Sequence, residues 1–123
     1  MQFNDERPIF LQLAEQLEEA ILTGVYEEET PVPSITEYSV AYQINPATAL
    51  KGINLLVDGG LLYKKRGVGM FVAPGAREKL RRVRRERFYT DYVEKLVGEA
   101  RRLEMTREEL AGLIERGFED NGN

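Results

Sequence analysis

Apolar side chains recur at different spacings along this chain, and the changes of spacing predict its elements. From Pro8 to Thr23 they follow at intervals of three and four residues, which places them on one face of a helix. Two further helical segments are predicted over residues 34–42 and 46–58. Two short apolar runs on either side of residues 66–69, which read Arg-Gly-Val-Gly, then predict a β-hairpin.

The ends of the second and third helices carry specific signals. Ser34 is expected to cap the second helix, and Glu37 completes a capping box. Asn45 is expected to cap the third helix, whose first position suits Pro46, and two consecutive glycines end it. Helix, tight turn, helix and hairpin in this order form a winged helix-turn-helix, a motif that lays its second helix in the major groove of DNA.

The segments outside this motif give less regular patterns. Residues 1–7 are polar and are predicted to be loose. Residues 25–32 contain three glutamates and a proline and are predicted to form a loop. Val32 and Pro33 are expected to add a short edge strand beside the hairpin, because proline is tolerated at a sheet edge.

The last third of the chain predicts two helices with uncovered apolar faces. A long helix is expected over residues 76–103, after the domain boundary at Pro74-Gly75, and Thr106 is expected to cap a last helix with Glu109 in a capping box. Nothing in residues 1–73 is large enough to cover these faces, so a second copy is the favoured partner, in a two-fold dimer. The alternative is that the helices fold back on the winged domain. The residues expected in the dimer interface are Tyr92, Leu96, Val97, Ala100, Leu103, Leu110, Leu113, Ile114 and Phe118.

Charge is distributed unevenly around a net value of −4. Residues 1–60 carry two basic and ten acidic side chains, residues 61–89 carry ten basic and two acidic, and residues 90–123 carry five basic and nine acidic. A DNA-binding surface needs a local positive patch rather than a positive total, and this central band can supply one. For residues 77–87 the alternative is an ordinary solvated charged helix, which composition alone favours.

Composition excludes several classes of protein. The 123 residues include no cysteine and no histidine, so disulfides, thiolate metal sites, the commonest general base and the commonest zinc ligand are absent. No apolar run approaches the roughly 20 residues that span a bilayer, and the N-terminus lacks the pattern of a signal peptide. We therefore expect a cytoplasmic protein without cofactor or metal, and an enzyme is the least favoured class.

Polar residues of the third helix and the hairpin are the candidate DNA contacts. Thr48 and Lys51 are of types that reach phosphates or base edges, although two ordinary exposed residues are an equal alternative. Lys64, Lys65 and Arg66 at the hairpin tip have no packing purpose. Beside a helix-turn-helix they indicate a wing that lies on the phosphate backbone or in the minor groove.

In combination, these segments resemble the GntR family of bacterial transcription regulators, and specifically its short YtrA-type subgroup. The resemblance rests on PIFLQLAEQLEEAILTG, the Pro33-Ser34 pair, NPATALKGINLLVDGGLL and KKRGVGMFV. It implies a mainly α fold with a small β-hairpin: a winged helix-turn-helix over residues 1–73 and a two-helix dimerisation domain over residues 74–123. The implied function is that of a homodimeric, sequence-specific repressor of transcription on an inverted-repeat operator in double-stranded DNA, with any small-molecule effector left undefined.

By position, the resemblance implies DNA contacts at Ser34, Thr36, Asn45, Thr48, Lys51, Lys65, Arg66 and Gly67. The chain departs from the family where many members have arginine instead of Thr36, arginine or a polar residue instead of Leu50, and a loop glycine instead of Glu29. Fewer arginines lower the affinity for phosphate and remove a potential guanine contact. Together with the acidic first half, these departures motivate the alternative function, a winged-helix protein-interaction module that does not bind DNA.

Overall fold

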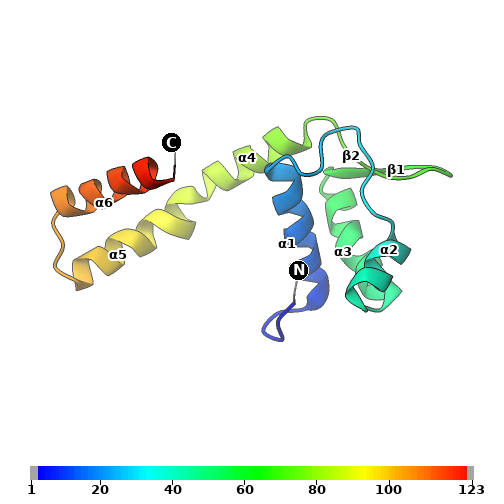
Figure 1. The fold of residues 1–123 in the computed structure, drawn as a ribbon, viewed down its shortest axis with the longest axis horizontal. Coiled ribbons are helices and arrows are strands. Elements are labelled where there is room, and N and C mark those ends of the chain that lie inside the picture. The colour runs from blue at the N-terminus through cyan, green and yellow to red at the C-terminus, as the bar shows by residue number, and fades with distance from the viewer. Residues whose placement is uncertain (1–2, 122–123) are drawn as a thin grey trace. The chain divides into compact units, whose positions relative to one another are not determined.

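The computed structural model describes residues 3–121, and the chain divides into two compact units, Met1–Val83 and Arg84–Asn123. The elements are α1 (Ile9–Leu22), α2 (Ile35–Tyr42), α3 (Pro46–Asp58), β1 (Leu62–Lys65), β2 (Gly69–Val72), α4 (Ala76–Glu86), the π-helical turn η1 (Tyr89–Val93), α5 (Glu94–Arg102) and α6 (Arg107–Asp120) (Figure 1). The predicted fold class, mainly helical with a small hairpin, is confirmed.

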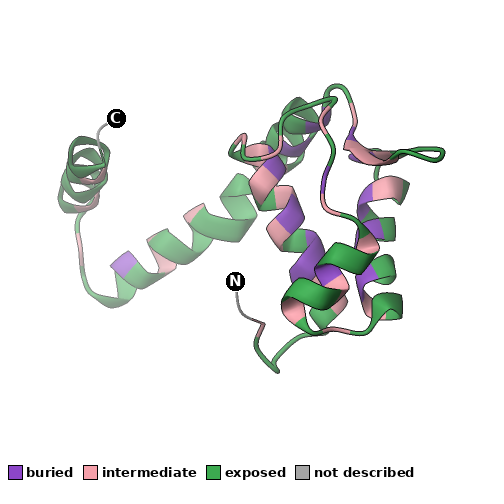
Figure 2. Cartoon of the chain, turned by 45° about the vertical axis from the view of Figure 1, so that its right-hand side comes forward, coloured by how far each residue is buried: buried purple, intermediate pink, exposed green. Residues whose placement is uncertain are grey.

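The core of the first unit lies between α1, α2, α3 and the hairpin (Figure 2). Its fully buried large side chains are Leu13, Ile21, Ile53, Leu56, Leu62 and Val72. Helices α1 and α3 lie close together at Gly52, where an added Cβ atom would lie 2.9 Å from the carbonyl oxygen of Phe10. Glycine at this position therefore lets the two helix backbones pack together.

The predicted helix caps are present in the helix-turn-helix. The Ser34 hydroxyl accepts a hydrogen bond from the Glu37 N–H at 3.0 Å, and the Ser34 N–H donates to the Glu37 carboxylate at 3.0 Å. Asn45 caps α3 by accepting from the Ala47 N–H at 2.8 Å. Between the helices Gln43 adopts a left-handed conformation with φ +52°, which turns the chain from α2 into α3.

The hairpin is antiparallel, and Leu62 on β1 lies opposite Val72 on β2. A third segment joins it on the β2 side: the Val32 N–H donates to the Met70 carbonyl at 2.9 Å, and Pro31 forms an isolated bridge with Phe71. The edge strand predicted at Val32 and Pro33 is therefore reduced to a bridge, and that bridge is centred on Pro31.

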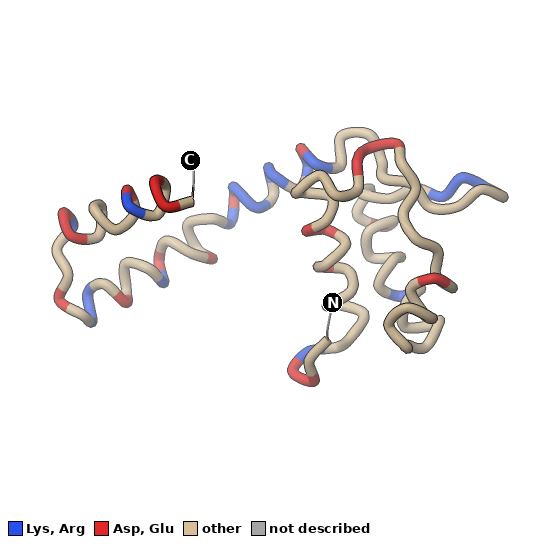
Figure 3. Tube along the Cα trace, viewed as in Figure 1, with Lys and Arg blue, Asp and Glu red and all other residues tan. Residues whose placement is uncertain are grey.

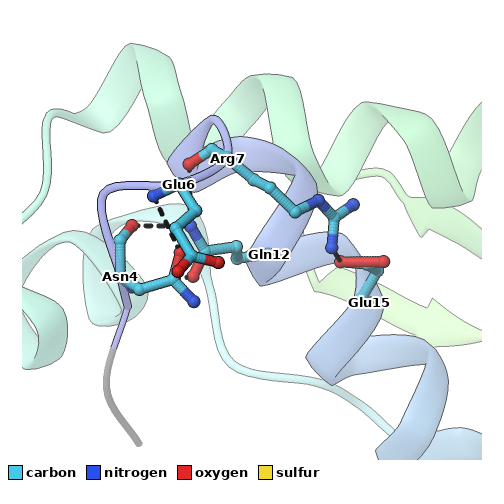
Figure 4. A network of polar contacts seen from close by, with 5 residues as sticks. All are labelled: Asn4, Glu6, Arg7, Gln12 and Glu15. Atoms are coloured by element: carbon cyan, nitrogen blue, oxygen red, sulfur yellow. Dashed lines mark hydrogen bonds and ion pairs between the residues drawn. The ribbon is translucent and has the colours of Figure 1, made fainter.

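The prediction of a loose N-terminal segment is wrong at Asn4 and Arg7, which are hydrogen-bonded to α1 (Figure 4). Buried Gln12 donates from its amide nitrogen to the carbonyls of Asn4 and Arg7, at 2.8 Å each, and accepts from the Asn4 N–H at 3.0 Å. A buried amide needs such partners, and the chain before the helix supplies them. Residues 1–2 lie outside the described residues.

The first turns of α4 belong to the winged unit. Ala76 and Leu80 are buried in its core. Arg77 donates to the carbonyl of Leu22 at 2.8 Å, and Lys79 donates to the carbonyl of Gly59 at 2.6 Å. These cations satisfy carbonyls at the C-terminal ends of α1 and α3, where the helix dipole favours positive charge. The first unit consequently extends to Val83, beyond the Pro74-Gly75 boundary expected from the sequence.

The single long helix predicted over residues 76–103 is interrupted. Residues Tyr89–Val93 form a π-helical turn, which contains more residues per turn than an α-helix and shifts the following side chains around the axis. Farther along, Thr106 and Glu109 form the predicted capping box at the start of α6, with hydrogen bonds of 2.9 and 3.1 Å. Of the residues described in the second unit, only Ala100 is buried.

Candidate nucleic-acid interface

The N-terminal ends of α2 and α3 carry five of the predicted contacts. Ser34 caps α2, and Thr36 is exposed in its first turn. Asn45 caps α3, and Thr48 and Lys51 lie in its first two turns. Helix N-termini present unpaired N–H groups and a positive dipole end, so both positions favour phosphate.

Helix α3 has one face in the core and one in solvent. Ala49 and Ile53 are fully buried against α1, whereas Lys51 and Asn54 are exposed. Thr48 is half-buried and lies at the edge between the two faces. An exposed polar strip on a helix whose opposite side is fixed by packing is the geometry that a groove-reading helix requires.

Lys51 is held by an aromatic ring of α1. Its ammonium nitrogen lies 4.1 Å from the centroid of the Phe10 ring, in a cation–π contact. Such a contact on an exposed side chain contributes about 0.5–1 kcal/mol, so an incoming phosphate can replace it. Nothing in the sequence indicated that Phe10 would contact the candidate surface, because an apolar residue of α1 was expected only in the core.

The tip of the hairpin is a tight turn, closed by the Val68 N–H donating to the Lys65 carbonyl at 2.9 Å. Gly67 has φ +77° in this turn, a conformation that favours glycine, and an added Cβ atom there would meet nothing within 4 Å. The backbone at Gly67 is therefore open to close approach. Figure 1 shows the hairpin extending beyond the three helices of the first unit.

The cations of the hairpin do not share one face. Successive side chains of a strand point to opposite sides, so Lys64 lies on the side of buried Leu62, and Lys65 on the side of Tyr63. The Lys65 ammonium lies 4.5 Å from the centroid of the Phe71 ring, which stacks on Tyr63. From the sequence, Lys64, Lys65 and Arg66 were expected to form one basic group. In the structure, the two lysines lie on opposite faces of the hairpin.

Glu29 occupies the loop position where the resemblance to the GntR family leads us to expect glycine. Its φ of +66° lies in the left-handed region, which explains why glycine suits this position. Its carboxylate accepts a hydrogen bond from the Tyr63 hydroxyl at 3.2 Å. Partial burial and this hydrogen bond raise the pKa of Tyr63 above its ordinary value.

Positive charge in the first unit gathers on the hairpin and along the start of α4 (Figure 3). Arg77 and Lys79 are engaged with helix ends, and Arg81 forms an ion pair with Glu78 at 3.5 Å. The basic band of the sequence is therefore structural at Arg77 and Lys79, while most of residues 77–87 are exposed, as expected for a solvated charged helix. None of the helices in residues 3–121 is long and apolar enough to cross a membrane.

These features define a winged helix-turn-helix protein, in which three helices and a hairpin form one unit with α3 exposed on one face. Residues 10–72 match the family of bacterial regulatory proteins called the gntR family. The match covers just over half of the chain, from α1 to the end of β2, and the chain belongs to this family. The family consists of transcription regulators rather than enzymes, and the identification made from the sequence is confirmed.

Two curated relatives are repressors from Bacillus subtilis (strain 168). The HTH-type transcriptional repressor NagR is 38% identical over 66 residues, which cover 54% of this chain and 27% of NagR. The HTH-type transcriptional repressor YtrA is 29% identical over 73 residues, which cover 59% of this chain and 56% of YtrA. The aligned part of the chain thus spans about a quarter of the length of NagR and just over half that of YtrA.

Solved structures extend the similarity to the second unit. A chain assigned to the GntR family of transcriptional regulators from Bacteroides thetaiotaomicron is 32% identical, with a TM-score of 0.72 over 94% of this chain and 99% of that one. The DNA-binding domain of AraR in complex with the operator ORX1 is 28% identical, with a TM-score of 0.55 over 58% of this chain and 93% of that one.

Proposed function

We propose that this protein is a homodimeric, sequence-specific repressor of the YtrA type that binds an inverted-repeat operator in double-stranded DNA. In this arrangement α3 lies in the major groove, and the hairpin lies on the phosphate backbone or in the minor groove. Family membership supports a DNA-binding regulator, and the names of NagR and YtrA support repression. A regulator of chromosomal DNA in a bacterial cell acts in the cytoplasm.

The observation that carries the proposal is the exposed strip of α3 beside an open, cationic hairpin. Lys51 and Asn54 are exposed while Ile53 is fully buried. The strip can therefore contact DNA while the opposite face of α3 stays packed in the core. The AraR domain, whose fold superposes on this unit, is bound to operator DNA in its own structure. Helix α1 packs on the buried face of α3, and its Phe10 ring contacts the Lys51 side chain at the edge of the strip.

The dimer is supported by the exposed apolar side chains of the second unit. Tyr92, Leu96, Leu103, Leu113, Ile114 and Phe118 are exposed, and Val97 and Leu110 are half-buried. Leaving such a set in water is unfavourable, and an identical copy supplies a complementary apolar surface. We propose that the second unit is the dimerisation domain, while the first turns of α4 serve the winged unit.

The test compares two variants on operator and on random duplex DNA. Operator fragments are first selected from genomic DNA with the wild-type protein. Thr48→Ala is expected to weaken operator binding by about 1–3 kcal/mol and to leave random-duplex binding nearly unchanged, if Thr48 contacts a base. Lys51→Ala tests the second candidate base contact of α3 in the same way.

The hairpin variant separates positioning from base reading. Replacing Lys64, Lys65 and Arg66 together with alanine is expected to weaken binding to all duplexes similarly. The salt dependence of binding should fall by up to about 0.9 per lost phosphate contact. An unchanged salt dependence would remove the hairpin from the interface. Absence of wild-type binding to any duplex at low salt would favour the protein-interaction module instead.

A further inference from the structure

The exposed face of α3 is not uniformly polar. Ala47 and Leu50 are exposed beside Lys51, and Leu50 is 42% exposed. Residues three positions apart are neighbours on a helix, so Ala47 and Leu50 form one small apolar area in the first two turns of α3. The core lies on the other face, where Ala49 and Ile53 are fully buried. Packing within the winged unit therefore does not require an apolar residue at position 50.

In the proposed function this apolar area meets base edges. The N-terminal residues of a recognition helix contact the base edges of the major groove, and Leu50 lies in the same two turns as Thr48 and Lys51. The resemblance to the GntR family leads us to expect arginine or a polar residue at position 50, and arginine would read guanine through two hydrogen bonds. The leucine side chain has no donor or acceptor. It cannot make that contact, and it would leave the polar edge of a guanine without a partner.

One base offers an apolar group that suits leucine. Thymine carries a C5 methyl group in the major groove, where the edges of guanine and adenine present hydrogen-bonding groups. A leucine side chain and a methyl group that contact each other both leave water, which is favourable. Ala47, one turn before Leu50, has a small side chain and lets a base edge approach the helix closely. The apolar area thus has the chemistry and the size to recognise a methyl group.

We propose that Leu50 is a specificity-determining residue, which contacts the C5 methyl group of a thymine in each half-site of the operator. This inference rests on the proposed function, because it needs α3 in the major groove. Lys51, the next residue along α3, supplies a charge for phosphate or a base edge, so the two side chains have different tasks. The base preferred opposite Leu50 is then thymine rather than guanine.

The test uses the operator duplex selected with the wild-type protein and replaces its thymines with deoxyuridine, one symmetric pair at a time. Uracil pairs with adenine as thymine does but lacks the C5 methyl group. One symmetric pair of replacements should weaken wild-type binding by about 15-fold, which corresponds to about fourfold for each lost methyl contact. In Leu50→Ala the same replacements should change the affinity by about twofold at most. Both proteins should bind random duplex equally, because Leu50 makes no phosphate contact.

Leu55→Ala is the matched control, because it removes an equally exposed leucine from the same helix. Leu55 is also 42% exposed, but it lies roughly 7.5 Å farther from the N-terminal end of α3 than Leu50 does. This variant should lose affinity for the deoxyuridine operator as the wild type does. If no deoxyuridine pair weakens wild-type binding, or if the loss persists in Leu50→Ala, this inference is overturned while the proposed function stands. A wild-type protein that binds no duplex more tightly than random DNA would overturn both.

Discussion

The two units of this chain are both helical, yet they treat their apolar side chains in opposite ways. The first unit buries Leu13, Ile53 and Val72 completely against its own elements. In the second unit Tyr92 is 61% exposed, Leu103 is 62% exposed, and Ala100 is the only buried residue among those described. Both units therefore form helices, but only the first encloses a hydrophobic core of its own.

Exposure of apolar side chains alone does not distinguish the units. Val40 on α2 is 73% exposed, and such isolated residues are normal on protein surfaces. The second unit differs because its exposed residues recur at helical spacing, as in Tyr92, Leu96 and Leu103, and so form a continuous face. Regular spacing of the exposed residues is therefore the feature that indicates an interface.

The largest expected effect comes from breaking that face. Leu96→Asp places a charge in the proposed dimer interface, where it would be buried without a partner, and should convert the dimer into monomers. Monomers lose the second half-site, so operator affinity should fall by about 100-fold or more. Size exclusion with light scattering measures the mass, and operator binding is measured on the same samples.

Lys95→Asp is the matched control, because it introduces the same residue at the neighbouring exposed polar position of α5. It should remain dimeric. A wild-type mass near the 14.1 kDa of one chain at micromolar concentration would contradict the dimer, and the inverted-repeat operator would lose its basis.

An intermediate effect, of opposite sign in the two units, is expected for glycine replacements in helices. Gly52→Ala forces a Cβ atom to 2.9 Å from the Phe10 carbonyl oxygen, and such overpacking costs about 1–3 kcal/mol. Gly112→Ala in α6 meets nothing within 4 Å and should stabilise its helix by about 0.5–1 kcal/mol. Urea unfolding of both variants gives the two values. A stabilising Gly52→Ala would mean that α1 and α3 separate easily, against the close packing described for them.

Local signals in the sequence predicted the helix-turn-helix well. Ser34 with Glu37, and Asn45 with Pro46, define helix starts by hydrogen bonds between near neighbours, and these bonds are present. The hairpin followed from glycines that its turn conformation requires. These predictions succeeded because the interactions that determine them lie within a few residues of one another.

Interactions between distant residues were not visible in the sequence. The bonds from Arg77 to Leu22 and from Lys79 to Gly59 join α4 to helix ends that lie far away in the chain. Basic residues in a charged helix gave no sign of this role. The need for glycine at position 52 depends on the approach of Phe10, and the π-helical turn breaks a pattern that otherwise continues as a helix. For the candidate site, residue types and order were predictable, but the opposite faces of Lys64 and Lys65 required the strand register.

The smallest expected effect is on the stability of the first unit and concerns Glu29. Its left-handed conformation costs a non-glycine residue about 1–2 kcal/mol, which Glu29→Gly would recover, less about 0.5–1 kcal/mol for the added freedom of the unfolded chain. The lost hydrogen bond from Tyr63 offsets the remainder, so the net stabilisation should stay below about 1 kcal/mol. In a Tyr63→Phe background that bond is already absent, and Glu29→Gly should then stabilise more.

Glu28→Gly, at an exposed neighbour without positive φ, should instead destabilise slightly, and the dimer mass should be the same in all variants because the second unit is untouched. If Glu29→Gly destabilised as much as Glu28→Gly, backbone strain at this loop would not limit the stability of the winged unit.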